Sequence, residues 1–221
     1  MSSTAEKLSF LTVEQYLTAE ETSSVKHEYI NGCIFAMTGA TSRHNRITGN
    51  IFTKLHAFVD GVPCQAYIEA FKVYIKEANC FYYPDIMVAC ESIDEESVFT
   101  ERPVLIVEVL SPSTAAIDRR EKLINYLRLP TLREYVMVHQ ARKKVELFRR
   151  DKVDTWSKEQ YHAGDHIVLK SFPNGELTLS VDSIYRNISQ TGGTLEVREG
   201  KDDYDDDVYA VPAAEAALLD W

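Results

Sequence analysis

The alternation of apolar and polar positions along the chain predicts an α/β domain built on a mixed central sheet. The run "VLIVEVL", residues 104–110, is apolar at every position but one, as expected of a central strand buried on both faces. Residues 115–129 follow a helical pattern. Residues 42–60 do so too, with one stripe of apolar side chains at spacings of three and four: Ile47, Ile51, Leu55 and Phe58. Strands alternating with helices indicate the α/β class.

Shorter patterns complete the prediction. Asn31-Gly32 lies between two strand-like runs and predicts a hairpin, because both residues tolerate positive φ. Thr12 and Ser42 are candidate N-caps of helices. Further strands are expected at residues 64–75, 82–90, 133–140 and 144–150. We expect one domain at residues 1–190, followed by an acidic C-terminal tail at residues 191–221.

Charge and composition narrow the function classes. The formal net charge is −10, and residues 191–221 carry nine acidic and two basic residues, or −7 of that total. The remaining −3 leaves room for a basic groove that could bind nucleic acid. No apolar run reaches 18 residues, and the stretch "MSSTAEKLSF" lacks the basic-then-apolar pattern of a signal peptide, so we expect a cytoplasmic protein without a membrane span. The four widely spaced cysteines are expected to be free thiols in that compartment.

Two carboxylates carry the chemical prediction. Glu108 is the single charge in the predicted central strand, where an uncompensated carboxylate costs on the order of several kcal/mol. Asp85 follows Pro84 at the start of the preceding strand. If the two strands pair, both carboxylates converge, and Mg²⁺ prefers such hard oxygen ligands. The alternative is structural, with Asp85 capping the strand entry and Glu108 paired to an arginine such as Arg133.

The ordered set "YYPD", "LIVEVLSPST" and "DRREKLINYLRLPTLREYVMV" resembles the Uma-two family, and "EYINGCIFAMTGATSRHNRI" resembles its N-terminal segment. The resemblance covers roughly residues 8–186. It implies a restriction-endonuclease-like fold of the PD-(D/E)xK superfamily and hydrolysis of phosphodiester bonds in DNA with Mg²⁺ or Mn²⁺. Asp85, Glu108 and the main-chain carbonyl of Val109 would hold the metal.

The chain departs from the superfamily pattern at the lysine of E-x-K, because Leu110 stands there. Lys122 is our first substitute, since Asp118, Lys122 and Tyr126 follow one another at intervals of four on one helix face. Lys72 is the second candidate, expected to contact substrate. An ordinary surface lysine paired with Asp118 is the alternative interpretation of Lys122.

Three further residues are softer candidates. His44 lies near the inward stripe of its helix and could bind substrate or transfer a proton. Glu28 could reach the metal from the hairpin, and Tyr126 could contact substrate. DNA is the expected partner, with a homodimer suiting the cleavage of two strands. The alternative function is a non-catalytic binding or structural protein on a nuclease fold.

Overall fold

The computed structural model describes residues 10–37, 39–111 and 118–189, so the predicted acidic tail lies outside the described residues. The helical elements are α1 (Val13–Thr22), α2 (Ser42–Val59), the 3-10 turn η1 (Lys76–Ala78), the π-helical turn η2 (Asp118–Lys122), α4 (Leu123–Leu127) and α5 (Val181–Ile184). The strands are β1 (His27–Ile30), β2 (Cys33–Ala36), β3 (Gln65–Ile68), β4 (Lys72–Ile75), β5 (Cys80–Tyr82), β6 (Ile86–Ala89), β7 (Phe99–Thr100), β8 (Pro103–Leu110), β9 (Glu134–His139), β10 (Lys144–Arg150), β11 (Trp156–His162), β12 (His166–Phe172) and β13 (Gly175–Ser180).

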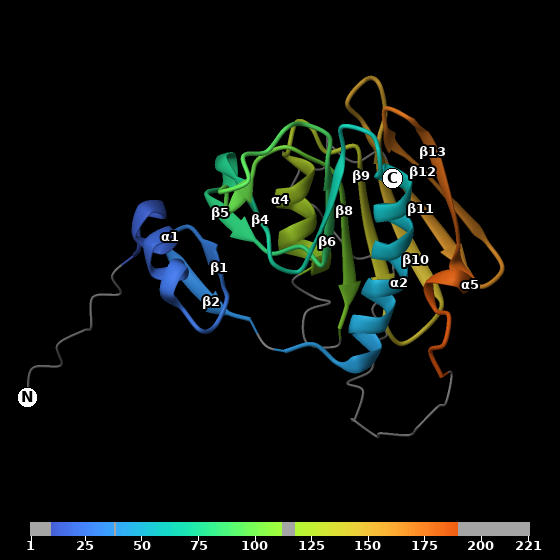
Figure 1. Ribbon diagram of the computed structural model, residues 1–221, viewed down its shortest axis with the longest axis horizontal. Coiled ribbons are helices and arrows are strands. Elements are labelled where there is room, and N and C mark those ends of the chain that lie inside the picture. The colour runs from blue at the N-terminus through green and yellow to red at the C-terminus, as the bar shows by residue number, and fades with distance from the viewer. Residues whose placement is uncertain (1–9, 38, 112–117, 190–221) are drawn as a thin grey trace, which may run out of the picture.

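A six-stranded mixed sheet, in the order β11-β10-β9-β8-β6-β3, forms the centre of the molecule (Figure 1). Strands β8 and β9 are parallel, and the other neighbouring pairs are antiparallel. A second sheet has the order β2-β1-β5-β4-β7, and β12 pairs with β13. The predicted α/β class with a mixed sheet is therefore confirmed, and β8 is a central strand as the run at 104–110 indicated.

The two faces of the six-stranded sheet have separate cores. On one face, α2 packs through the predicted stripe, and Ile47, Ile51 and Leu55 are at most 2% exposed. The pair β12–β13 and helix α5 complete that core. On the other face, α4 packs against β8, β9 and residues of the second sheet (Figure 1). Burial at this scale is the main term that holds the layers together.

The N-terminal predictions agree closely with the structure. The Thr12 hydroxyl accepts a hydrogen bond from the Gln15 N–H, and the Gln15 side-chain oxygen accepts one from the Thr12 N–H. This pair of bonds is a capping box at the start of α1. Asn31 and Gly32 form the β1–β2 turn with φ of 49° and 93°. A Cβ at Gly32 would lie 2.8 Å from the Phe10 side chain, so this glycine also permits a close approach.

Three boundaries differ from the prediction. Helix α2 is capped by Thr41, whose hydroxyl accepts from the His44 N–H, and Ser42 is its first residue. The run 64–75 is two strands rather than one, because the chain turns sharply after Ile68. The second predicted helix ends at Leu127, and its first residues, 115–117, lie outside the described part of the chain.

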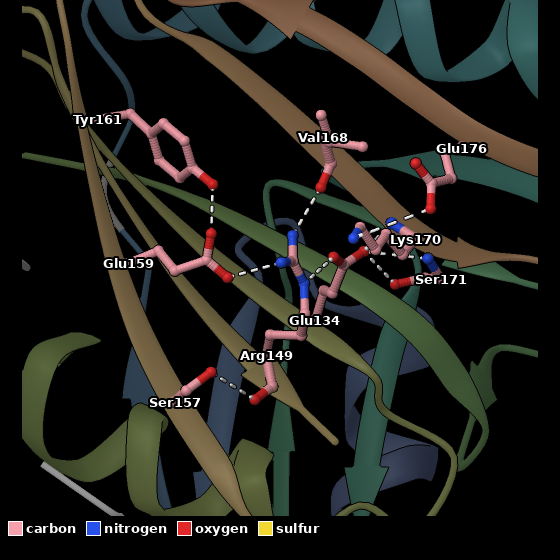
Figure 2. Close-up of polar contacts among 9 residues, drawn as sticks. All are labelled: Glu134, Arg149, Ser157, Glu159, Tyr161, Val168, Lys170, Ser171 and Glu176. Atoms are coloured by element: carbon pink, nitrogen blue, oxygen red, sulfur yellow. Dashed lines mark hydrogen bonds and ion pairs between the residues drawn. The ribbon is translucent and has the colours of Figure 1, made fainter. Parts of the chain in front are cut away.

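A buried carboxylate network fastens β12 to the central sheet (Figure 2). Glu134 on β9 is 1% exposed and accepts from Arg149 Nε at 2.9 Å. Its other oxygen accepts from the Lys170 N–H at 2.8 Å and from the Ser171 N–H and hydroxyl. Arg149 also donates to Glu159 on β11. Donors within the protein thus satisfy both oxygens of the buried Glu134 carboxylate, so we assign Glu134 a structural role.

The prediction of four free thiols is wrong for one pair, because Cys64 and Cys90 form a disulfide. The two residues are 26 positions apart in the sequence, but they flank the register pair Gln65 and Ala89 of β3 and β6. The disulfide closes the end of the β3–β6 ladder opposite Asp85. None of the helices in the described part of the chain is long and apolar enough to cross a membrane.

We predict that reducing the Cys64–Cys90 disulfide lowers the free energy of unfolding by about 3.5 kcal/mol, the chain-entropy value for two cysteines that are 26 residues apart. Alkylation in denaturant should label two cysteines before reduction and four after it, as counted by mass spectrometry. Cys33→Ser is the matched control, because Cys33 is exposed and not disulfide-bonded. Equal labelling before and after reduction would contradict the assignment.

Candidate metal and nucleic-acid site

Asp85 and Glu108 lie on neighbouring strands and are joined by hydrogen bonds between those strands. The antiparallel pairing of β6 with β8 places Ile86 opposite Val107, so Asp85 lies beside Glu108. The Asp85 N–H lies 3.3 Å from Glu108 Oε2, and the Val109 N–H donates to Asp85 Oδ2 at 2.6 Å. Asp85 and Glu108 therefore lie side by side on paired strands, and a main-chain N–H group contacts each carboxylate.

The second oxygen of Glu108 meets the helix that follows β8. The Tyr126 hydroxyl donates to Glu108 Oε1 at 3.0 Å, and Lys122 Nζ lies 3.5 Å from the same atom. Lys122 Nζ also lies 2.8 Å from Glu28 Oε1 on β1. Glu108 is 4% exposed and Lys122 is 6% exposed, so these charges interact in a medium of low polarity. The structure brings two predicted residues, Lys122 and Tyr126, to Glu108, and it brings a third, Glu28, to the amine of Lys122.

Lys122 is oriented by its surroundings and is not a free surface lysine. It ends the π-helical turn η2, a rare conformation that recurs at functional sites. Its Nζ lies 5.5 Å from the ring centroid of Tyr82, a cation–π distance. Burial, with the charge of Glu108 second, raises the pKa of Tyr126 well above its usual value, so its hydroxyl remains a donor.

His44 contacts the other carboxylate. It is the third residue of α2, and its Nε2 lies 3.1 Å from Asp85 Oδ2. Burial lowers the pKa of His44, but the hydrogen bond to Asp85 and the charges of Asp85 and Glu69 outweigh it, so the pKa is raised overall. His44 therefore lies at the site, in contact with Asp85, as its place near the helical stripe suggested.

Lys72 takes a different position. It opens β4, is 7% exposed, and its Nζ lies 5.3 Å from the ring centroid of Tyr83. Burial lowers its pKa, against the raising effect of Glu20 and Glu21. In the described part of the chain, the amine that reaches Glu108 is that of Lys122 and not that of Lys72.

The donor set fits a divalent cation with oxygen ligands. Among the described residues, no three His, Cys, Asp or Glu side chains are already arranged as a metal-binding group. Mg²⁺, however, commonly uses only one or two carboxylates and completes its shell with water and substrate phosphate. Glu28 and Glu108 both approach the amine of Lys122, and Asp85 lies beside Glu108 in the strand register. That acidic balance suits Asp85, Glu108 and the Val109 carbonyl as cation ligands.

One neighbour was missed by the sequence prediction. Glu69 follows β3, and its N–H donates to the Asp85 carbonyl at 3.0 Å. In the sequence, Glu69 lies inside a run that predicts one continuous strand, so no pattern distinguishes it. Its place beside Asp85 depends on the pairing of β3 with β6, which periodicity does not specify.

We predict that Lys122→Met lowers the free energy of unfolding by about 3 kcal/mol, because it removes the cation between the buried carboxylate of Glu108 and the partly buried carboxylate of Glu28. Urea unfolding measures the change. Lys170→Met is the control, since Lys170 is half-exposed and its Nζ lies 3.8 Å from Glu176, a surface pair worth less than about 1 kcal/mol. Equal losses in the two variants would show that Lys122 is not buried between these acids.

Known proteins resemble this chain over most of its length. Residues 13–182 match the profile of the Uma2 family, which is described as "putative restriction endonuclease". The Synechocystis sp. protein slr1290 is 35% identical over 180 residues, covering 81% of this chain and 93% of its own. A second protein of that organism, sll1609, is 33% identical over 143 residues, covering 63% and 81%. Both are described as uncharacterized.

A solved structure supports the fold. The crystal structure described as "a putative nuclease belonging to DUF820" from Anabaena variabilis superposes with a TM-score of 0.66 at 17% identity. It covers 79% of this chain and 97% of its own. The family resemblance expected from "YYPD" and "LIVEVLSPST" is thus confirmed, over bounds close to those expected. The chain belongs to the Uma2 family of restriction-endonuclease-like proteins.

Proposed function

We propose that the protein is a Mg²⁺-dependent endonuclease that hydrolyses phosphodiester bonds of DNA. The observation that carries the proposal is the position of Glu108, which lies beside Asp85 on the paired strand and 3.5 Å from Lys122 Nζ. Two acids beside a buried lysine are the groups that metal-assisted phosphoryl chemistry requires. Family membership supports a nuclease, and the choice of DNA and of Mg²⁺ belongs to the proposal.

The acids of the site would hold the metal, and the lysine would serve the phosphate. Asp85 and Glu108 provide carboxylate oxygens that main-chain N–H groups already orient, so binding requires little reorganisation. A bound Mg²⁺ would polarise the phosphate and lower the pKa of an attacking water. Lys122 lies on η2 and not two residues after Glu108, where E-x-K has its lysine. Its ammonium group would stabilise the charge that develops on the phosphate.

Tyr126, Glu28 and His44 would act as positioning residues. Tyr126 fixes the orientation of Glu108, and Glu28 holds the Lys122 ammonium from the opposite side. His44 holds Asp85 Oδ2 from helix α2. Each contact comes from a different element, so the site depends on the packing of the whole domain.

We predict that Mg²⁺ or Mn²⁺ supports cleavage of plasmid or single-stranded DNA by the wild type, measured by gel electrophoresis. Glu108→Gln preserves the side-chain shape but removes the metal-binding charge, so the rate should fall more than about 100-fold. Lys122→Met should cost about 100- to 1000-fold, as expected for the loss of one electrostatic stabiliser. Glu77→Gln, an exposed acid on η1, is the control and should retain the wild-type rate.

Three results would count against this assignment. Cleavage that survives Glu108→Gln would exclude Glu108 as a metal ligand. Cleavage that survives Lys122→Met would show that another lysine, such as Lys72, stabilises the charge on the phosphate. DNA binding without cleavage in either metal would favour the non-catalytic binding protein.

A further inference from the structure

Lys72 is a buried lysine that has no acid bound to its amine. It opens β4 and is 7% exposed, so its stem lies inside the protein, while its Nζ atom still reaches solvent. Among the described residues, this Nζ makes no ion pair and no hydrogen bond. The two other buried lysines described there differ, because Lys122 lies 2.8 Å from Glu28 and Lys144 lies 3.2 Å from Glu146. A buried cation without an anion beside it is costly.

The ring of Tyr83 has two ammonium groups near it. Lys72 Nζ lies 5.3 Å from the ring centroid and Lys26 Nζ lies 5.6 Å from it, both cation–π distances. Two positive charges at one ring repel each other. Burial is the main cause that lowers the pKa of Lys72, and the charge of Lys26 lowers it further. An anion that contacts both ammonium groups would offset this repulsion.

The acids around these lysines are engaged elsewhere or act at longer range. Glu20 accepts hydrogen bonds from the His27 N–H at 2.8 Å and from the Tyr83 hydroxyl at 2.9 Å. Its other oxygen lies 3.1 Å from His27 Nδ1. Glu20 and Glu21 raise the pKa of Lys72 through their charge, but in the described part of the chain neither forms an ion pair with it. Glu20 therefore orients the ring of Tyr83 and leaves the Lys72 ammonium open to a ligand.

Strand pairing places Lys72 close to Asp85. Val73 is in register with Tyr82 in the antiparallel pair β4–β5, so Lys72 lies opposite Tyr83. Tyr83 precedes Asp85 by two residues, which span roughly 7 Å of extended chain. A nucleic-acid strand has one phosphate per about 3.4 Å of helix axis. Lys72 thus lies within a few phosphates of the acid assigned to the metal.

Lys26 reaches the same place from the segment between α1 and β1. Its Nζ donates to the Glu69 carbonyl at 2.8 Å, and the Glu69 N–H donates to the Asp85 carbonyl at 3.0 Å. Lys26 is exposed, and an ammonium group has three donors, so it keeps capacity for a second acceptor. Two lysines from separate elements therefore meet at Tyr83, beside the start of β6.

We propose that Lys26, Lys72 and Tyr83 form a subsite for one phosphodiester group of a nucleic-acid strand, next to the phosphate that the site cleaves. The bound phosphate would contact both ammonium groups, since lysine binds phosphate as a point charge. It would provide the anion that Lys72 lacks and offset its repulsion with Lys26. The inference rests on the proposed function in taking nucleic acid as the substrate, but binding at this subsite needs neither metal nor cleavage.

Binding of a short fluorescein-labelled DNA strand in EDTA, followed by fluorescence anisotropy, tests the subsite without turnover. Lys72→Met and Lys26→Met should each weaken binding about tenfold, the loss expected for one charge-assisted hydrogen bond. The slope of log K against log salt should fall by about 0.7 in each variant. Lys170→Met, which removes the same charge from an exposed position on β12, should bind as the wild type does. Unchanged binding by Lys72→Met would exclude the subsite.

A neutral methylphosphonate, placed at one position of the DNA strand at a time, shows whether a phosphodiester is the ligand. At one position the replacement should weaken binding to the wild type about tenfold and leave binding to Lys72→Met unchanged, because that variant has already lost the contact. Equal effects on the two proteins at every position would overturn the proposal. Inorganic phosphate is the second probe. If calorimetry shows that it binds through Lys72 as tightly as the DNA strand does, the assignment to nucleic acid is wrong.

Steady-state kinetics separate this inference from the proposed function. Lys72→Met should raise KM about tenfold and leave kcat within about twofold of the wild type, because the subsite holds a phosphate that does not react. A fall in kcat with unchanged KM would place Lys72 at the reacting phosphate and contradict the subsite. DNA binding through Lys72 without cleavage in Mg²⁺ or Mn²⁺ would support the subsite and contradict the proposed function.

Thermal unfolding gives a readout that distinguishes a binding lysine from a structural one. Lys72→Met keeps an unbranched side chain and removes a buried charge that lacks an anion, so the variant should unfold at a temperature no lower than that of the wild type. The DNA strand should raise the unfolding temperature of the wild type more than that of the variant. A variant that is less stable than the wild type and gains as much stability from DNA would show that Lys72 is structural.

Discussion

The reciprocal hydrogen bonds between Asp85 and strand β8 are the constraint on which the site depends. Each carboxylate lies near a main-chain N–H group on the other acid's strand. The Asp85 N–H faces the Glu108 carboxylate, and the Val109 N–H donates to the Asp85 carboxylate. This arrangement exists only in the observed register of β6 and β8. The two cores on either face of the sheet then deliver the remaining groups, with α2 bringing His44 to Asp85 and α4 bringing Tyr126 to Glu108.

Two buried glutamates of the same sheet show how surroundings decide a role. Glu134 is held by an arginine, two main-chain N–H groups and a hydroxyl, all of them donors that a structural anion needs (Figure 2). Glu108 instead shares its lysine with a second acid, Glu28, and lies beside a third, Asp85. An excess of acids costs stability in the metal-free protein, and a cation would offset that cost. The first glutamate is thus part of the scaffold, and the second is suited to bind a ligand.

Local sequence patterns predicted most of the helices and strands. Most of the features that they missed depend on how the strands pair. The capping box at Thr12, the Asn31-Gly32 turn, the stripe on α2 and the apolar run of β8 depend on neighbours in sequence, so the sequence specified them. The Cys64–Cys90 disulfide and the position of Glu69 depend on the register of β3 with β6, which no periodicity encodes. Lys122 was foreseen because the spacing of four from Tyr126 is local. Its contact with Glu28 needed the tertiary structure.

The central claim is that Asp85 and Glu108 together bind a divalent cation. Anomalous diffraction from crystals soaked in Mn²⁺ tests that claim most directly, because the signal locates manganese without reference to activity. We expect an anomalous peak within coordination distance, about 2.0–2.2 Å, of a carboxylate oxygen of each of these two residues. The absence of that peak in crystals that diffract well and contain bound manganese elsewhere would contradict the account, and Glu108 would then be a structural partner of Lys122 and Tyr126.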